Sequence, residues 1–343
     1  MKKQTISNSI VDRENILNNP FALKNIQKEF LQIPYFEFEK KVIILKQDVI
    51  DFFQVSEDSI DRTLSENSAE LKKNGYEVIS GKRVAGLKKT IGPRKFAGTK
   101  TTRIGVFDFR SFLNLSMVLT GSVVAEKTRS RILDIVVSTL HKKVGSNRKY
   151  INQRDDTFLP SYVSNADVRN KFTRTLGICV EGNNNKYPHF TNLIYVDLFG
   201  EDAVEYRKLL KLGDRENVRS TFYREILDIV SGYEEGISAA LKENYEKKGK
   251  QITLDQAEAL FNKCFQSPFL RIPKETARRL MASRDKAFRE IIHEALLPYI
   301  EALPEEEYKK FLSEKSKVIG GKTKDIIALI DKNKEVFDRL KDK

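Results

Sequence analysis

The chain has 343 residues, of which 40% are hydrophobic and 32% charged, a balance that supports packed cores and excludes an intrinsically disordered protein. No apolar run approaches the roughly 20 residues needed to cross a bilayer. The N-terminus lacks the apolar stretch of a secretory signal, and the two cysteines, Cys179 and Cys264, form no C-x-x-C pair. We therefore expect a cytoplasmic protein with no membrane partner, no metal site and no cofactor.

The positive charge is unevenly placed along the chain, whose net charge is +13. Residues 1–39 carry 5 Lys/Arg and 5 Asp/Glu, residues 40–174 carry 26 and 14, and residues 175–343 carry 30 and 29. A charge that only confers solubility would be spread, whereas a local excess is typical of a surface that binds a polyanion. Residues 40–174 are therefore the predicted nucleic-acid-binding domain.

The first 39 residues predict an N-terminal arm with one helix. Asn19 precedes Pro20, which favours the first helical position, so we expect a helix from about Pro20 to Leu31. Residues 35–45 (YFEFEKKVIIL) alternate and end in a β-branched run, which predicts a strand.

A helix-turn-helix pair is expected next. Residues 46–53 (KQDVIDFF) have a short apolar face, and Ser56 is a favourable N-cap for a second helix from Glu57 to about Lys73. Two helices joined by so short a turn are typical of DNA-binding modules. The candidates for base contacts on the second helix are Ser59, Arg62, Thr63 and Asn67. Several acids share that helix and disfavour contact with phosphates, so a purely structural pair is the alternative.

A basic, glycine-rich stretch follows, with no Asp or Glu from residue 78 to residue 107. Residues 76–80 and 102–109 are strand-like and predict a β-hairpin, or wing, whose flexible connection lets cationic side chains approach phosphates. The predicted phosphate contacts are Lys82, Arg83, Lys88, Lys89, Arg94, Lys95, Lys100 and Arg103. A solvated loop without a partner and a membrane-surface patch are the alternatives for this stretch.

Two further helices are expected at residues 110–119 and 122–143, and the second begins another basic cluster. Lys127 and Arg131 are four residues apart and share a helix face. The cluster comprises Lys127, Arg129 and Arg131, followed by Lys142, Lys143, Arg148, Lys149 and Arg154. These cations either extend the same groove or are ordinary solvated charges.

The order of elements over about residues 41–147 resembles the KilA-N/Bro-N/RhuM group of phage and prophage DNA-binding modules. The matching positions are Phe107, Phe109, Arg129 and Arg131. The resemblance implies a winged-helix-like domain that binds DNA. In length and layout, the chain is also similar to the BstA-like prophage abortive-infection proteins, which implies DNA binding that blocks phage replication.

The remainder of the chain predicts a boundary and a helical domain. Residues 145–200 are rich in Asn and Gly, so we place an irregular linker at 175–200. Helices are expected at residues 201–212, 215–247, 253–266, 274–301, 304–316 and 322–341. Their apolar faces favour packing, and the final helix is a candidate for homodimerisation, which would engage two DNA half-sites.

The predicted fold class is therefore α+β: a winged-helix-like, KilA-N-like N-terminal domain with a small β-hairpin, then an all-α C-terminal domain. The expected segments are 1–39, 40–174, 175–200 and 201–343.

No convincing catalytic group of residues stands out. The histidines His141, His189 and His293 show no metal-ligand spacing, and Arg289-x-x-x-His293 is one residue short of the Arg–His pair of HEPN ribonucleases. We therefore expect a non-enzymatic protein that binds double-stranded DNA, with RNA as a further target to test, and acts by occupying it. The alternatives are a toxin-like nuclease with a catalytic helical domain and a protein whose basic face binds an acidic protein.

Overall fold

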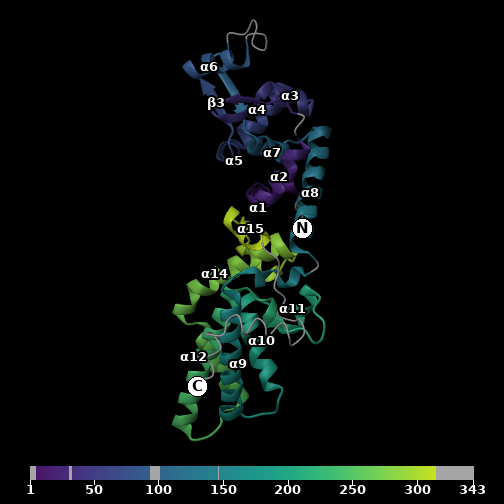
Figure 1. Ribbon diagram of the computed structural model, residues 1–343. Helices are drawn as coiled ribbons and strands as arrows, with labels where there is room; N and C mark the ends of the chain where they lie inside the picture. The colour runs from purple at the N-terminus through teal and green to yellow at the C-terminus, as the bar shows by residue number, and fades with distance from the viewer. Residues whose placement is uncertain (1–4, 31–32, 93–100, 146, 314–343) are drawn as a thin grey trace. The chain divides into compact units, whose positions relative to one another are not determined.

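The computed structural model describes residues 5–30, 33–92, 101–145 and 147–313 (Figure 1). The chain divides into two compact units, residues 1–142 (unit 1) and residues 143–343 (unit 2). The boundary therefore lies after Lys142, and the irregular linker predicted at 175–200 is wrong. Two helices, α9 (Phe158–Cys179) and α10 (Lys186–Phe199), occupy most of that region, because buried residues such as Phe172 and Leu176 recur at helical spacing.

Unit 1 begins with two helices that pack into its core rather than with a separate arm. They are α1 (Ile10–Asn18) and α2 (Pro20–Glu29), preceded by the 3-10 turn η1 (Ile6–Asn8). The side chain of Asn19 accepts hydrogen bonds from the backbone N–H groups of Phe21 and Ala22, and Pro20 is at the first helical position. The predicted helix after Asn19 is confirmed, whereas the sequence analysis did not predict α1.

A four-stranded antiparallel sheet of order β1-β2-β4-β3 is the centre of unit 1. Its strands are β1 (Phe36–Phe38), β2 (Lys41–Leu45), β3 (Glu77–Ser80) and β4 (Arg103–Phe107). The single strand predicted at 35–45 is a hairpin instead. Glu39 and Lys40 both have positive φ, of 50° and 63°, which suits the tight turn between twisted antiparallel strands.

Six more helices complete unit 1: α3 (Lys46–Phe53), α4 (Glu57–Glu66), α5 (Ser68–Lys73), α6 (Lys82–Ile91), α7 (Phe109–Val118) and α8 (Val123–Val144). The predicted helix pair is present as α3 and α4, with the Ser56 hydroxyl accepting from the Ser59 N–H. The second helix is shorter than predicted, because the chain leaves the helical conformation at Asn67 before α5 begins.

The two faces of the sheet are covered by different cores. Ile44 and Phe107 face a larger core that includes residues of α3 and α7, such as Phe53 and Phe112. Ile43, Leu45, Ile104 and Val106 face a smaller core completed by Val84 and Leu87 of α6. Burial on both faces explains why β2 appears in the sequence as a continuous apolar run instead of a polar–apolar alternation.

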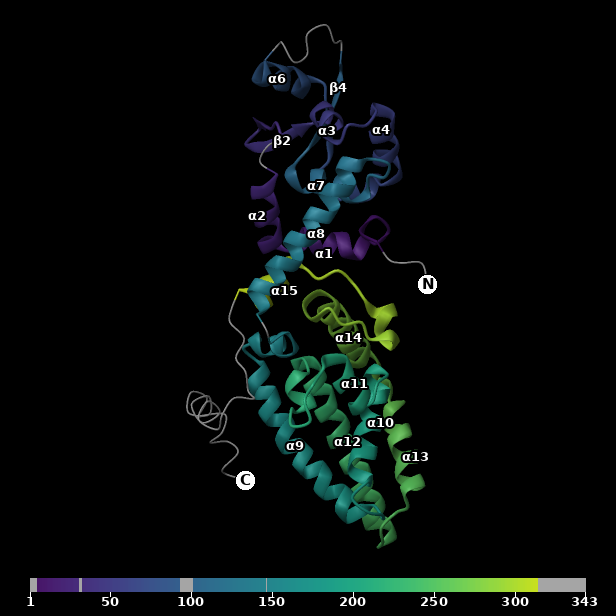
Figure 2. The ribbon, with the colours of Figure 1, turned by 90° about the vertical axis from the view of Figure 1, so that its right-hand side faces the viewer.

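All regular elements in the described residues of unit 2 are helices, apart from one isolated bridge between Val180 and Ile252. Besides α9 and α10 it contains η3 (Arg148–Arg154), α11 (Ala203–Leu210), η4 (Val218–Thr221), α12 (Arg224–Lys248), α13 (Leu254–Phe265), α14 (Pro268–Arg284), the π-helical turn η5 (Asp285–Arg289), η6 (Glu294–Tyr299) and α15 (Glu305–Leu312). The long helices α9 and α12 lie side by side (Figure 2). The α+β class with a helical C-terminal part is therefore confirmed.

The helix boundaries of unit 2 agree in part with the sequence. The helix predicted at 253–266 is confirmed, and the Thr253 hydroxyl accepts from the Gln256 N–H at 3.3 Å. The helix predicted at 274–301 ends at Arg284 instead, because η5 follows and Glu290 adopts a left-handed φ of 58°. The predicted helix 322–341 and its proposed dimer contact lie outside the described residues. Among the helices that are described, none combines the length and the apolarity needed to span a bilayer.

Candidate nucleic-acid interface

The basic stretch contains the helix α6, so the prediction of a flexible wing is only partly correct. Strands β3 and β4 do pair, with Val78 opposite Gly105 and Ile79 opposite Ile104. The connection between them, however, contains a helix. Val84 and Leu87 are one helical turn apart and bury against the sheet, so helix formation gains apolar burial that an open loop would not provide. In Figure 1, α6 lies at the end of unit 1 away from α1 and α2.

The cations of this stretch have different environments. Lys82, Lys89 and Arg103 are exposed and form no ion pair within the part of the chain that the structure describes. Lys88 donates a hydrogen bond to the backbone carbonyl of Thr101 at 3.1 Å. Arg94, Lys95 and Lys100 lie outside the described residues.

Arg83 differs from its neighbours because two carboxylates hold it. Its guanidinium lies 2.6 Å from Glu39 and 3.1 Å from Glu77. The hydrogen bond to Glu39, and then that to Glu77, raises the pKa of Arg83, while Arg83 lowers the pKa of Glu39. The group is still exposed, but its charge is largely balanced, so we expect it to contribute less to phosphate binding than Lys82 or Lys89.

Helix α4 has a mainly acidic outer surface. Glu57, Asp58, Asp61 and Glu66 are all exposed on it. The ammonium of Lys46 lies 2.9 Å from Glu57 and 2.6 Å from Asp61 and so balances only part of this charge. The candidate residues on this helix must therefore act beside several carboxylates.

The four candidates for base contacts are not equivalent. Arg62 is exposed and Ser59 is half-buried. Thr63 is only 5% exposed and its hydroxyl donates to the Ser59 carbonyl at 2.9 Å. Asn67 donates to the Thr63 carbonyl at the end of α4. The structure corrects the expectation for Thr63, which is part of the helix packing and is not accessible to a base edge.

On α8, Arg129 has a structural position. Its Nη1 donates to the backbone carbonyls of Ser116 at 3.1 Å and Leu119 at 2.6 Å, at the C-terminal end of α7. Burial lowers the pKa of Arg129. Helix ends leave carbonyls without partners, and a cation there satisfies them. The expectation that Arg129 contacts nucleic acid is therefore corrected. Arg131 pairs with Glu29 at 2.6 Å, and Lys127 is exposed.

Three later cations of the predicted domain, all in η3 (Arg148–Arg154), belong to unit 2 and have partners there. Arg148 pairs with Glu290 at 2.8 Å and Lys149 with Glu216 at 2.6 Å. Arg154 donates to the backbone carbonyl of Phe311. At the structural boundary, residues 1–142 carry 24 Lys/Arg and 16 Asp/Glu, and residues 143–343 carry 37 and 32. The excess is thus +8 and +5, less concentrated than the segment 40–174 suggested.

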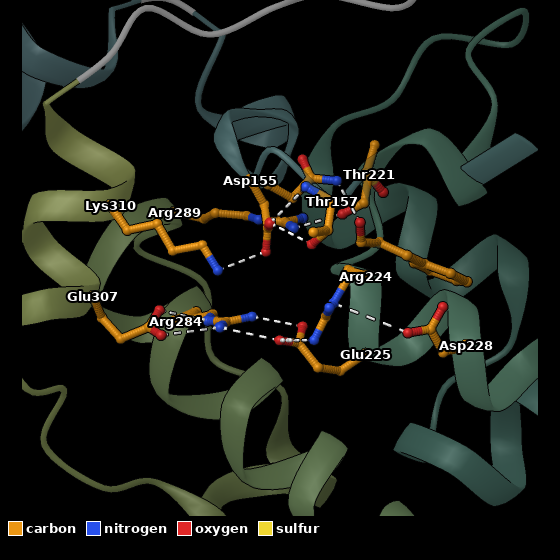
Figure 3. Close-up of polar contacts among 12 residues, drawn as sticks. Asp155, Thr157, Thr221, Arg224, Glu225, Asp228, Arg284, Arg289, Glu307 and Lys310 are labelled. Atoms are coloured by element: carbon orange, nitrogen blue, oxygen red, sulfur yellow. Dashed lines mark hydrogen bonds and ion pairs between the residues drawn. The ribbon is translucent and has the colours of Figure 1, made fainter. Parts of the chain in front are cut away.

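Unit 2 contains a second group of charged residues, which lies in its interior. Figure 3 shows Arg284, only 2% exposed, between Glu225 of α12 and Glu307 of α15. The guanidinium is 2.8 Å from Glu225 and 3.1 Å from Glu307. Burial disfavours its charge, yet the two carboxylates outweigh this effect and raise the pKa of Arg284. The sequence analysis did not find this group, since its members lie 59 and 23 residues apart.

The Arg289–His293 pair belongs to this interior region as well. Arg289 and His293 are 5% and 2% exposed. Arg289 donates to the Thr221 carbonyl at 2.5 Å and lies 3.1 Å from Asp285. Among the described residues, no group of His, Cys, Asp and Glu side chains is arranged to hold a metal ion.

The fold and these contacts define a two-unit α+β protein with an exposed cationic helix and strand end on unit 1 and a charged interior in unit 2. No protein-family model matches the chain, and no curated protein matches it significantly. The resemblance to the KilA-N/Bro-N/RhuM group therefore remains a prediction.

Proposed function

We propose that unit 1 binds double-stranded DNA through the outward face of α6 and the adjoining end of β4. The observation that carries this proposal is the fold of the acid-free stretch. Its apolar residues, Val84 and Leu87, pack inward, so Lys82 and Lys89 are exposed, and Arg103 is exposed at the start of β4. Long cationic side chains on an ordered element are suited to phosphate contacts, which position a protein on the duplex without reading its sequence.

The proposed role is to occupy DNA, as a regulator or as a block to phage replication. The resemblance of unit 1 to phage and prophage DNA-binding modules supports this role, as does the BstA-like layout. Because the exposed surface of α4 is acidic, the proposal assigns most of the affinity to phosphate contacts and little to base contacts. Binding should then weaken steeply as salt increases.

The test compares two variants of the full chain with equal loss of charge. One carries Lys82→Ala, Lys89→Ala and Arg103→Ala; the control carries Lys24→Ala, Lys28→Ala and Lys72→Ala, three exposed lysines elsewhere in unit 1. Fluorescence anisotropy with duplex DNA and with duplex RNA gives the dissociation constants at several salt concentrations.

The α6 variant should bind DNA about 10- to 100-fold more weakly, and the slope of log Kd against log salt should decrease by up to about 3. The control variant should bind like the unaltered chain. Equal losses in both variants would mean that net charge alone matters and would contradict the proposed surface. Tighter binding of duplex RNA than of duplex DNA would mean that RNA is the target of unit 1.

The nuclease alternative is not supported by the contacts in unit 2. A general base must reach a proton of the substrate. His293 is 2% exposed, and its two ring nitrogens lie 2.6 Å from Asp285 and 2.8 Å from Glu201. These contacts occupy both nitrogens, so we make no catalytic proposal for this pair.

A further inference from the structure

Unit 1 contains an open pocket of about 390 Å³ between the sheet and the start of α3. Its floor includes Val78 of β3 and Gly105 of β4, which are directly opposite each other in the register. Val78 is a β-branched apolar residue in β3, the edge strand of the sheet, and it is 47% exposed. A patch of apolar surface in the pocket is therefore exposed to solvent beside the cationic stretch.

At Gly105, other side chains pack directly against the backbone of β4. A Cβ atom at this position would lie 2.9 Å from the hydroxyl of Tyr76 and 3.5 Å from the Cβ of Lys46. Both of those residues line the pocket. Because glycine has no side chain, Tyr76 and Lys46 come close to the backbone of β4 and cover it there, so the apolar surface that stays open in the pocket is that of Val78.

The walls of the pocket combine an aromatic ring with polar groups. Burial raises the pKa of Tyr76, so its hydroxyl stays protonated and can donate a hydrogen bond. Lys46 is partly buried, which disfavours its charge, but hydrogen bonds to Asp61 and Glu57 outweigh burial and raise its pKa. Arg103 is exposed among the lining residues and has no ion pair within the described ranges.

An exposed apolar side chain, an aromatic wall and an exposed guanidinium together match the chemistry of a nucleotide. Every base has a planar face that stacks on apolar and aromatic surfaces, and a phosphate pairs with arginine. The volume is within the range of about 300–1,000 Å³ typical of small-ligand sites. A base inside a duplex cannot reach such a pocket, whereas an unpaired nucleotide can leave the stack at low cost.

We propose that this pocket receives one unpaired nucleotide, with its base on Val78 beside Tyr76 and its phosphate at Arg103. The inference rests on the proposed DNA binding of unit 1 and deepens it, because the nucleotide is part of the bound DNA. The protein then prefers DNA with an unpaired base over a continuous duplex. A free nucleoside monophosphate has the same chemistry and is the other source to distinguish.

The experiment uses the full chain and three probes: a fully paired DNA duplex, the same duplex with a single bulged nucleotide, and free dAMP. The variant Val78→Phe fills the floor, and Val42→Phe is the matched control. Val42 lies in β2 of the same sheet, is 48% exposed against 47% for Val78, and does not line the pocket. Equal exposure means that neither substitution forces a ring into a core, so the two variants differ in whether the ring enters the pocket. Circular dichroism confirms that each variant is folded.

The unaltered chain should bind the bulged duplex about 5- to 150-fold more tightly than the paired one, the range expected for one stacked base. Val78→Phe should lower this ratio to about one without weakening binding of the paired duplex, and Val42→Phe should preserve it.

A ratio near one for the unaltered chain, or a ratio that survives Val78→Phe, would contradict the proposed nucleotide pocket but not the DNA-binding proposal. Failure to bind either duplex would overturn both. The chain could instead bind dAMP, lose that binding in Val78→Phe and show no preference for the bulged duplex. This result would mean that the pocket binds a free nucleotide and not a nucleotide of DNA.

Discussion

The imidazole of His293 lies 2.6 Å from the carboxylate of Asp285, and both side chains are completely buried in unit 2. Glu201 is 2.8 Å from the other ring nitrogen. The ring of Tyr206 stacks on the imidazole, with centroids 5.5 Å apart. Burial disfavours a charged imidazole, but the hydrogen bonds to Asp285 and Glu201 outweigh burial and raise the pKa of His293 to about 9. The ring is thus a buried cation near neutral pH.

The stability of unit 2 should depend on pH through this residue. Because the folded state holds the proton more tightly than the unfolded state, the stabilisation is complete below about pH 6.5 and is lost as the pH rises through about 9. We expect the free energy of unfolding to decrease by on the order of 3 kcal/mol over that range. Urea unfolding at a series of pH values measures this decrease. His293→Gln should remove most of it, whereas His189→Gln, at an exposed histidine, should not; an identical pH profile in both variants would contradict the assignment.

Arg284 should contribute far more to stability than its neighbour Arg279 on the same helix. Arg284→Ala would leave two carboxylates, Glu225 and Glu307, in the interior without their cation. Removing one partner of a buried ion pair typically costs about 3–5 kcal/mol. Arg279, 46% exposed and 3.6 Å from Glu301, should cost less than about 1 kcal/mol on substitution by Ala. Equal unfolding free energies for the two variants in urea titrations would show that the buried pair is not stabilising.

Two glycines that end helices should respond differently to alanine. Gly200 follows α10 with a φ of 85°, and a Cβ there would lie 2.3 Å from the Cβ of Ala295. Gly249 follows α12 with a φ of 66°, but a Cβ there meets nothing within 4 Å. Gly249→Ala should therefore cost about 1 kcal/mol from backbone strain alone. Gly200→Ala should cost clearly more because η6 must also move, and thermal unfolding of the two variants would reveal the difference; a smaller loss for Gly200→Ala would disagree with this packing.

Arg129 and Lys127 should be distinguishable by stability rather than by DNA binding. Arg129→Ala removes two hydrogen bonds to carbonyls at the end of α7, so we expect a loss of about 1–3 kcal/mol in the free energy of unfolding. Lys127 is exposed, so Lys127→Ala should change stability by less than about 0.5 kcal/mol. Neither variant should change DNA affinity as strongly as the triple α6 variant. A large loss of DNA affinity in folded Arg129→Ala would mean that Arg129 contacts DNA and that α8 is part of the interface.

Some of the fold was predictable because its signals are local. Asn19 followed by Pro20 correctly marked the start of α2, and the Thr253 cap did the same for α13. The α+β class followed from strand-like pieces in the first half and helical periodicity in the second. These features depend on residues within a few positions of each other, whose propensities and caps act before any tertiary contact forms.

The helix α6 was not predicted, because its glycines and cations are typical of a loop. Only the sheet explains it: Val84 and Leu87 form a helix face by burying against Ile79 and Ile104. The same reason applies to the hairpin at Glu39 and Lys40, since neither residue favours a positive φ in isolation. In both places the free energy of packing outweighs the local preference of the chain.

By itself, the sequence determined the fold class, the positions of most helices and the presence of an acid-free basic stretch. Only the tertiary structure decided which cations are exposed, and it showed that Arg129 caps a helix while Lys82 and Lys89 face solvent. It alone placed Val78 opposite Gly105, and Arg284 between Glu225 and Glu307. The physical reason is that charge and polarity belong to single residues, whereas exposure, ion pairing and pocket shape depend on partners brought together from distant parts of the chain.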